Sequence, residues 1–167
     1  MRRIRPEDVP SVMAIERASF PVPWEERVIL GFAQRGGAAL LRDGRRAFFE
    51  VFVTENTVVG YIAWEMSSRS SEDRAHVINI AVDERFRRRG IGTEMLRRLF
   101  ERLRRRHCSG CWLEVRRSNL PAQSLYESMG MRCIGVRPMY YRNEDALIYS
   151  VSFRDLDRPT NRGPMTS

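Results

Sequence analysis

Lysine is absent from this chain of 167 residues, so all 29 basic residues are arginine. Such one-sided usage indicates a compositional bias rather than selection for a binding surface, although the formal charge of +8 alone would suggest nucleic acid. The excess charge is also local, because residues 85–106 hold ten arginines and only two acids, Glu94 and Glu101. We therefore do not expect nucleic acid as the primary ligand.

Long apolar runs and cysteines are also scarce. No apolar stretch approaches the roughly 20 residues that span a bilayer, and the N-terminus lacks the apolar segment of a secretory signal. We therefore expect a cytoplasmic protein without membrane association. Three cysteines are an odd number, which argues against a disulfide framework. Cys108 and Cys111 form a single C-x-x-C, and we expect them to pack as small hydrophobic residues rather than to bind a metal.

The most informative stretch is residues 79–92, Asn-Ile-Ala-Val-Asp-Glu-Arg-Phe-Arg-Arg-Arg-Gly-Ile-Gly. It predicts a strand, a short turn and the start of a helix. A helix N-terminus has free backbone N–H groups and the positive end of the helix dipole, so it suits a phosphate. Gly90 and Gly92 would let a ligand approach these N–H groups. We therefore expect a ligand that carries a diphosphate, although the motif is neither a dinucleotide fingerprint nor a P-loop.

Helical and strand-like patterns alternate along the chain. The expected helices are 6–20, 24–34, 90–106 and 121–129, the last capped by Ser118 or Asn119. The first expected strand ends at residues 4–5. The other expected strands are 48–54, 57–66, 76–82, 111–115, 131–142 and 146–153. This order predicts an α/β fold of mixed α+β type, with a mostly antiparallel sheet of six to seven strands and helices on both faces.

Several finer expectations concern single segments. Glu55 and Asn56 are expected to form a tight turn, and strand 76–82 is apolar enough to be buried on both faces. Residues 38–47 show no clear pattern, and 67–73 form a polar loop. We expect one domain, residues 1–153, followed by a disordered tail, residues 154–167.

These residues resemble the GNAT acetyltransferase superfamily. Arg87-Arg-Arg-Gly-Ile-Gly92 fits its pyrophosphate motif, Q/R-x-x-G-x-G/A, and the predicted order of elements is similar to the GNAT fold. Further segments resemble the RimI-type ribosomal-protein alanine N-acetyltransferases. They are Phe20-Pro-Val-Pro-Trp24, Asn79-Ile-Ala-Val-Asp83, Trp112-Leu-Glu-Val-Arg116, Ser118-Asn119, Leu125-Tyr-Glu-Ser-Met-Gly130, Tyr140-Tyr141 and Glu144-Asp-Ala146.

The resemblance implies acetyl-CoA as the acetyl donor, no metal, and a protein N-terminus as the acceptor, possibly the alanine of a ribosomal protein. It implies that Glu114 is the general base and Tyr126 the general acid. The implied cofactor-binding residues are Ile80, Ala81 and Val82 at the acetyl and pantetheine part, Arg87, Arg88, Arg89, Gly90, Ile91, Gly92 and Thr93 around the pyrophosphate, and Asn119 on the pantetheine arm.

Acetyl transfer needs a neutral amine, a polarised carbonyl and a protonated leaving thiol. An N-terminal α-amine has a pKa of about 8, so roughly a tenth of it is neutral at pH 7, against far less of a lysine amine. A carboxylate such as Glu114 can remove the remaining proton, and a phenol such as Tyr126 can protonate the thiolate. The alternatives are that Glu114 is merely solvated and that Tyr126 is a core residue.

The acceptor side is less determined. Trp24, Tyr140 and Tyr141 can line a peptide groove or pack in the core, and the sequence favours neither. His76 could be an auxiliary base, although a histidine at the start of a strand is typically structural. The alternative functions are acetylation of a lysine side chain or of a small-molecule amine, and a non-enzymatic RNA-binding module that uses the arginine-rich helix.

Overall fold

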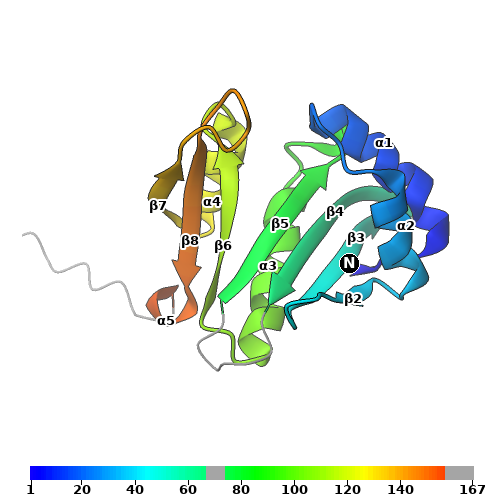
Figure 1. The fold of residues 1–167 in the computed structure, drawn as a ribbon, viewed down its shortest axis with the longest axis horizontal. Coiled ribbons are helices and arrows are strands. Elements are labelled where there is room, and N and C mark those ends of the chain that lie inside the picture. The colour runs from blue at the N-terminus through cyan, green and yellow to red at the C-terminus, as the bar shows by residue number, and fades with distance from the viewer. Residues whose placement is uncertain (67–73, 157–167) are drawn as a thin grey trace, which may run out of the picture.

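The computed structural model describes residues 1–66 and 74–156, and these form one central sheet (Figure 1). Its order is β1-β3-β4-β5-β6-β8-β7, with β2 also paired to β3, and only β5 and β6 run parallel. The strands are β1 (Arg2–Arg3), β2 (Ala38–Leu40), β3 (Arg46–Thr54), β4 (Thr57–Met66), β5 (Arg74–Val82), β6 (Gly110–Arg116), β7 (Arg132–Arg137) and β8 (Ala146–Ser152). The expected mixed, mostly antiparallel sheet is confirmed, and the short strand β2, which the sequence did not indicate, raises its size to eight strands.

Helices cover both faces of this sheet, as expected. The helices are α1 (Val9–Ser19), α2 (Glu26–Gln34), α3 (Ile91–Arg105), α4 (Leu120–Ser128) and α5 (Phe153–Leu156), with short 3-10 helices η1 (Pro6–Asp8) and η2 (Glu84–Phe86). One core lies between α1, α2 and the face that carries Phe49 and Tyr61, and the other lies between α3, α4 and the opposite face. Within the described chain, no helix is both long and apolar enough to cross a membrane.

Helix α3 follows directly from the periodicity of its sequence. Its inward face carries the buried side chains of Met95, Leu96, Leu99, Phe100 and Leu103. Arginines on the outer face pair along the helix, with Arg97 Nε 2.7 Å and Arg98 Nε 2.6 Å from Glu94 carboxylate oxygens. Such exposed pairs contribute little stability, so these arginines form the solvated face of an amphipathic helix.

Local backbone chemistry confirms some expected boundaries and corrects others. Glu55 and Asn56 both have positive φ, 48° and 63°, as a two-residue hairpin turn requires. The first strand is Arg2–Arg3 rather than a strand ending at 4–5, because Ile4 leads into η1. β7 stops at Arg137 rather than at 142, because Pro138 lacks the N–H that a paired strand needs.

Three other expectations, on residues 38–47, on the two cysteines and on the end of the domain, can be compared with the structure. Residues 38–47, which show no sequence pattern, contain β2. Cys108 and Cys111 are buried in the core beneath α3, which confirms that they pack as small hydrophobic residues. Helix α5 extends the described structure to Leu156, three residues beyond the expected end of the domain. The expected polar loop 67–73 and the tail from 157 onward lie outside the described residues.

The parallel strands β5 and β6 separate after a short pairing. Only residues 74–77 of β5 pair with 110–113 of β6. Ile78 is skipped in the pairing of β5 with β4, which makes it a β-bulge, and it is 36% exposed. The expectation that strand 76–82 is buried on both faces is therefore wrong at Ile78, and the second half of the strand has no strand neighbour on the β6 side among the described residues, which leaves an open edge there.

Candidate functional site

A cavity of about 800 Å³ lies where β5 and β6 separate. Its walls come from β5, the turn before α3, the first turn of α3, α4 and the end of α1. Ten of the predicted cofactor-binding residues line it, and Tyr126 lines it as well. The ten are Ile80, Ala81, Val82, Arg87, Arg88, Gly90, Ile91, Gly92, Thr93 and Asn119. The structure thus brings together residues from three elements that the sequence assigned to one ligand.

The start of α3 is built to hold an anion. Gly90 caps the helix with a φ of 76°, and Arg88 before it also lies in the left-handed region, at 62°. The first backbone N–H groups of α3 have no partners within the helix and point toward its N-terminal end. Glycine serves two purposes here. Gly90 permits the left-handed turn, whereas a Cβ on Gly92 would come within 3.0 Å of Leu125 on α4.

The three successive arginines have different environments. The guanidinium of Arg87 donates to the carbonyl oxygen of Val82 (3.0 Å) and to Ser19 Oγ on α1 (3.2 Å), so it holds the rim of the cavity together. Arg88 is exposed and lines the cavity. Arg89 lies over the ring of Phe86 at 5.2 Å and is not among the cavity-lining residues. Arg88 is therefore the arginine best placed to meet a bound phosphate.

The open edge of β5 offers backbone groups to the cavity. Asp83 N–H bonds to Val59 on β4, and by the alternation of an antiparallel strand Ile80 and Val82 face away from β4. The carbonyl of Val82 is occupied by Arg87, which agrees with this orientation. Ile80 and Val82 can therefore hydrogen-bond a ligand that lies along β5 as an added strand would.

Helix α4 brings Asn119 and Tyr126 to the opposite wall. Asn119 is the N-cap of α4, and its Oδ1 accepts from the N–H of Ala122 at 3.3 Å. Of the two expected caps, the structure selects Asn119 over Ser118. Tyr126 is 5% exposed, and burial together with the neighbouring Tyr141 raises the pKa of its phenol well above the ordinary value of 10. The phenol therefore stays protonated at neutral pH, as a proton donor must.

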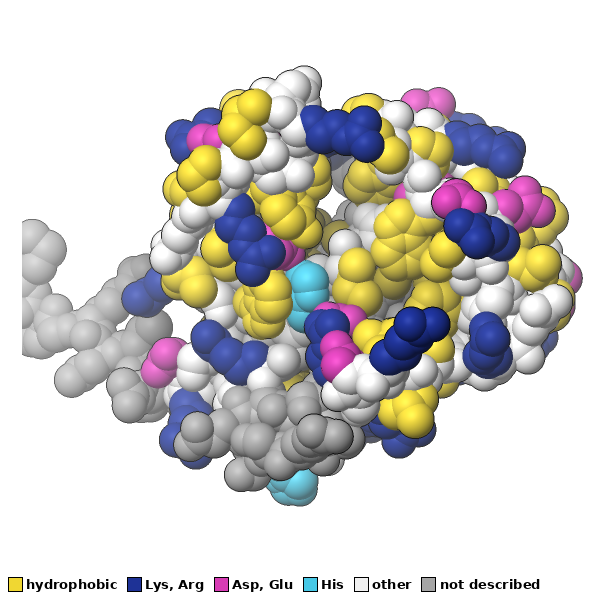
Figure 2. Space-filling model, in the orientation of Figure 1, with side chains coloured by type: hydrophobic (Ala, Val, Ile, Leu, Met, Phe, Trp, Pro, Cys, Tyr) yellow, Lys and Arg dark blue, Asp and Glu magenta, His cyan; other side chains and the backbone are white. Residues whose placement is uncertain are grey.

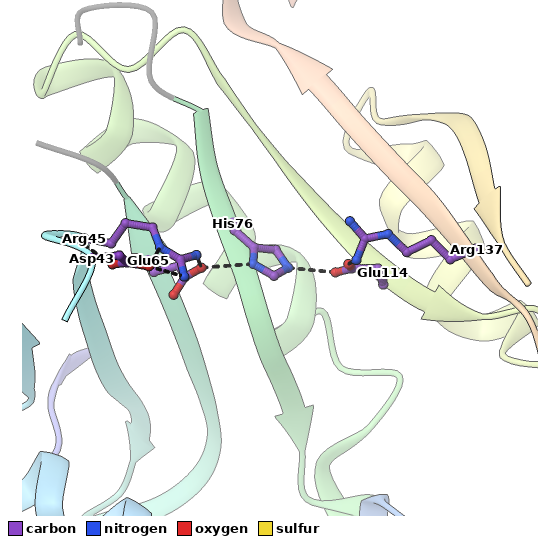
Figure 3. Close-up of polar contacts among 6 residues, drawn as sticks. All are labelled: Asp43, Arg45, Glu65, His76, Glu114 and Arg137. Atoms are coloured by element: carbon purple, nitrogen blue, oxygen red, sulfur yellow. Dashed lines mark hydrogen bonds and ion pairs between the residues drawn. The ribbon is translucent and has the colours of Figure 1, made fainter. Parts of the chain in front are cut away.

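Glu114 does not line the cavity but lies on β6 at the point where β5 and β6 separate. Its side chain is only 5% exposed, so the alternative of a merely solvated carboxylate is wrong. Glu114 Oε2 lies 2.7 Å from Nε2 of His76, and Oε1 accepts from Arg137 at 2.6 Å (Figure 3). Figure 2 shows this face of the molecule hollowed between the two halves of the sheet, with basic, acidic and hydrophobic side chains around the hollow.

Two of the predicted acceptor residues lie close to Glu114. The hydroxyl of Tyr141 donates to the backbone carbonyl of Glu114 at 3.3 Å, and burial raises the pKa of Tyr141 to about 12. Tyr140 is 48% exposed and packs edge-on against Tyr141. Their loop is fastened to the end of β6 by an ion pair between Arg116 and Glu144 at 3.2 Å. Tyr141 thus contacts Glu114 directly and also contributes to the raised pKa of the Tyr126 phenol.

Trp24 lies elsewhere, between α1 and α2. The centroid of its ring lies 6.2 Å from that of Phe49, and its backbone N–H donates to Glu16 at 2.8 Å. Glu16 is 1% exposed and also accepts from Tyr61 and Asn79. This buried network fixes α1 against β4 and β5, so Trp24 belongs to the support of the cavity wall rather than to the surroundings of Glu114.

Sequence reasoning missed several residues of the site. Ser19 and Phe20 line the cavity, at the end of α1 and directly after it, and neither was assigned to the ligand, although Phe20 belongs to a segment that resembles the family. Arg137 and Glu65 contact the Glu114 network across strand pairs, which no local pattern reveals. Among the described residues, no group of three or more His, Cys, Asp or Glu side chains could hold a metal ion.

Comparison with known proteins finds one family across most of the chain. The model of the acetyltransferase (GNAT) family matches residues 9–131. The [ribosomal protein bS18]-alanine N-acetyltransferase of Escherichia coli K12 is 34% identical over 148 residues, with 86% of this chain and 90% of that protein covered. An N-alpha-acetyltransferase of Saccharolobus solfataricus is 32% identical over 158 residues, with 89% of each chain covered. The crystal structure of Ard1 from Thermoplasma volcanium is 26% identical, with a TM-score of 0.73 and 90% and 95% of the two chains covered.

Proposed function

The chain belongs to the GNAT family of acetyltransferases, and we propose that it transfers the acetyl group of acetyl-CoA to the N-terminal α-amine of a protein. The observation that carries this proposal is the cavity that joins the N-terminus of α3 to the open edge of β5 and to Tyr126. We propose that the acetyltransferase domain comprises residues 1–153 together with the rest of helix α5, which ends at Leu156. The proposed place of the reaction is the cytoplasm, where acetyl-CoA and ribosomal proteins meet.

Acetyl-CoA fits the cavity by its chemistry. The free N–H groups at the start of α3, the guanidinium of Arg88 and the absence of side chains at Gly90 and Gly92 suit a diphosphate. The backbone of Ile80 and Val82 suits the amide groups of the pantetheine arm, and Asn119 can hydrogen-bond it from the other wall. The thioester would then lie beside Val82 and Tyr126, where a backbone N–H of β5 can stabilise its developing oxyanion.

The acceptor amine approaches from the face of the sheet that carries Glu114. Glu114 removes a proton from the ammonium, the freed electron pair attacks the acetyl carbon, and the C–S bond breaks. Tyr126 protonates the sulfur as it leaves, because its phenol is held in the protonated form by burial. Tyr140 and Tyr141 lie where the first residues of an acceptor peptide would pass.

The N-terminal alanine of ribosomal protein bS18 is the proposed acceptor. Support comes from the E. coli relative, whose name states this substrate and which aligns with 86% of the present chain. An α-amine also needs less help from a base than lysine, since its pKa is about 8 rather than 10.4. The bS18 N-terminus is thus a substrate that a single buried carboxylate can activate.

The test is incubation with acetyl-CoA and peptides that carry the bS18 N-terminus, followed by mass spectrometry that localises the acetyl group. We expect modification of the α-amine and none when that amine is blocked beforehand. A matched peptide with a blocked N-terminus and an internal lysine distinguishes the alternative acceptor. Acetylation of the lysine side chain alone would contradict the proposal.

A further inference from the structure

Six charged or titratable side chains form a continuous series of polar contacts across the sheet (Figure 3). In order they are Asp43, Arg45, Glu65, His76, Glu114 and Arg137. The series begins at the exposed turn between β2 and β3, crosses β4, β5 and β6, and ends on β7. Glu114, the proposed base, is therefore connected to the surface on one side through His76 and on the other through the half-exposed Arg137.

His76 is held on three sides. Its Nε2 lies 2.7 Å from Glu114 Oε2, and its Nδ1 lies 3.3 Å from Glu65 Oε1. Its ring stacks on the indole of Trp112, with centroids 3.8 Å apart and planes 4° apart. The strand register causes this arrangement, because His76 pairs with Glu65 on β4 and with Trp112 on β6. Both ring nitrogens are thus directed at carboxylates by packing that fixes the ring plane.

The two carboxylates face both ring nitrogens, so the contacts of His76 depend on where its hydrogens lie. A carboxylate oxygen only accepts, so both contacts are hydrogen bonds only if both ring nitrogens carry hydrogen. A neutral imidazole has one such hydrogen, and the imidazolium has two. Three carboxylates and two guanidiniums leave the series with one negative charge when His76 is neutral, and protonation of His76 cancels it. Little water reaches the centre, since the side chains of Glu65, Glu114 and His76 are 8%, 5% and 18% exposed.

We propose that His76 is a positioning residue for Glu114 and that it receives the proton which Glu114 removes from the acceptor amine. This inference rests on the proposed function. An N–H bond of the ammonium breaks and its proton joins Glu114 Oε2. The new O–H bond then breaks as Nε2–H forms, and the resulting imidazolium releases a proton through Glu65 to the surface around Arg45. The proton does not need to pass to Asp43 to reach the solvent.

The remaining protons and electrons balance. The amine electron pair forms the C–N bond, and the C–S electron pair leaves on sulfur, which takes a proton from Tyr126. The amine loses a second proton as the amide forms, and this proton restores Tyr126. One proton per turnover is left over, and it is the one that passes through His76.

The test compares the two histidines of the chain. His76→Asn removes the contacts described above, whereas His107→Asn changes an exposed residue at a φ of 59°, a conformation that asparagine tolerates. We expect His76→Asn to lower kcat roughly ten- to a hundredfold, as displacement of a catalytic group does, with KM for acetyl-CoA unchanged. The shape of its kcat profile against pH should also differ from that of the wild type, which a loss of folded protein alone would not cause. His107→Asn should retain the wild-type profile.

Glu65→Gln provides a second variant that leaves His76 and Glu114 in place. Because it removes the carboxylate that faces Nδ1 of His76, the dependence of kcat on pH should change while KM for acetyl-CoA does not, an effect that a merely structural role of Glu65 would not cause. Wild-type profiles and kcat in both variants would overturn the role of His76 while leaving the proposed function intact. If His76→Asn does not fold, Glu65→Gln alone decides. A wild-type protein that does not acetylate α-amines would overturn the proposed function, and this inference with it.

Discussion

Replacing Tyr126 with phenylalanine removes one hydroxyl group and leaves the ring in the core. The ring packs near Tyr149 at 5.9 Å and is 5% exposed. Within residues 1–66 and 74–156 the hydroxyl has no hydrogen-bond partner, so its removal breaks no bond of the fold. We therefore expect the free energy of unfolding to change by less than about 0.5 kcal/mol, or to rise slightly.

The same substitution should strongly reduce acetyl transfer. If Tyr126 protonates the leaving thiolate, its loss lowers kcat about 10²–10⁴-fold, as for other general acids, which corresponds to about 3–5 kcal/mol in the barrier. The assay is release of free thiol at saturating acetyl-CoA and peptide, together with thermal melts. Tyr149→Phe is the matched control, because its hydroxyl bonds to Glu127 at 2.7 Å and its loss should affect stability but not kcat. A kcat within about threefold of wild type in Tyr126→Phe would refute the reasoning.

Burial of Tyr126 also predicts a loss of stability in alkali. A tyrosine in the unfolded chain ionises above about pH 10, whereas burial raises the pKa of Tyr126 in the folded state. Its contribution is therefore fully present below pH 10 and is lost as the pH rises, by about 1.4 kcal/mol per pH unit. Tyr141, with its pKa raised to about 12, acts in the same direction between pH 10 and 12. Urea unfolding from pH 9 to 11.5 should show a smaller decline for Tyr126→Phe, and an equal decline would contradict the argument.

Two further substitutions test the start of α3. Gly90→Ala should destabilise the protein by about 1–2 kcal/mol, the cost of a side chain in the left-handed region, because nothing within 4 Å would obstruct the new Cβ. A melting temperature equal to that of wild type would show that this turn can relax. Arg88→Gln should raise KM for acetyl-CoA and weaken its dependence on salt, measured between 50 and 500 mM NaCl, whereas the equally exposed Arg105→Gln should change neither.

The parts of the site that the sequence predicts are those that depend on neighbours along the chain. The cradle at residues 87–93 is contiguous, and the helical period of α3 identifies its buried face without knowledge of the sheet. Asn119 and Tyr126 lie two turns apart on one helix, so their common direction follows from helix geometry alone. Each of these features needs only local rules of backbone and side-chain geometry.

The parts that the sequence does not predict depend on strand order and on where a pairing ends. The separation of β5 and β6 after Val77 is decided by tertiary packing, and the apolar residues of strand 76–82 suggested burial instead. The partners of Glu114 come from β5, which pairs directly with β6, and from β7, whose Arg137 reaches Glu114 across the intervening β8. The two carboxylate neighbours of His76 also lie on different strands, so no local pattern indicates them.

The separation of β5 and β6 also determines whether the two substrates can be bound at the same time. It opens the β5 edge to a cavity bounded by α3 and α4, and it leaves Glu114 on β6 at the point where the pairing ends. Donor and acceptor can therefore be bound at once, and direct attack needs no acetylated enzyme. No cysteine is among the described residues that line the cavity, and Cys133 lies on the edge strand β7.

Initial rates measured against acetyl-CoA at several peptide concentrations should give intersecting double-reciprocal lines. Parallel lines would indicate a ping-pong reaction through a covalent intermediate, and would require a nucleophile other than the residues assigned to this site.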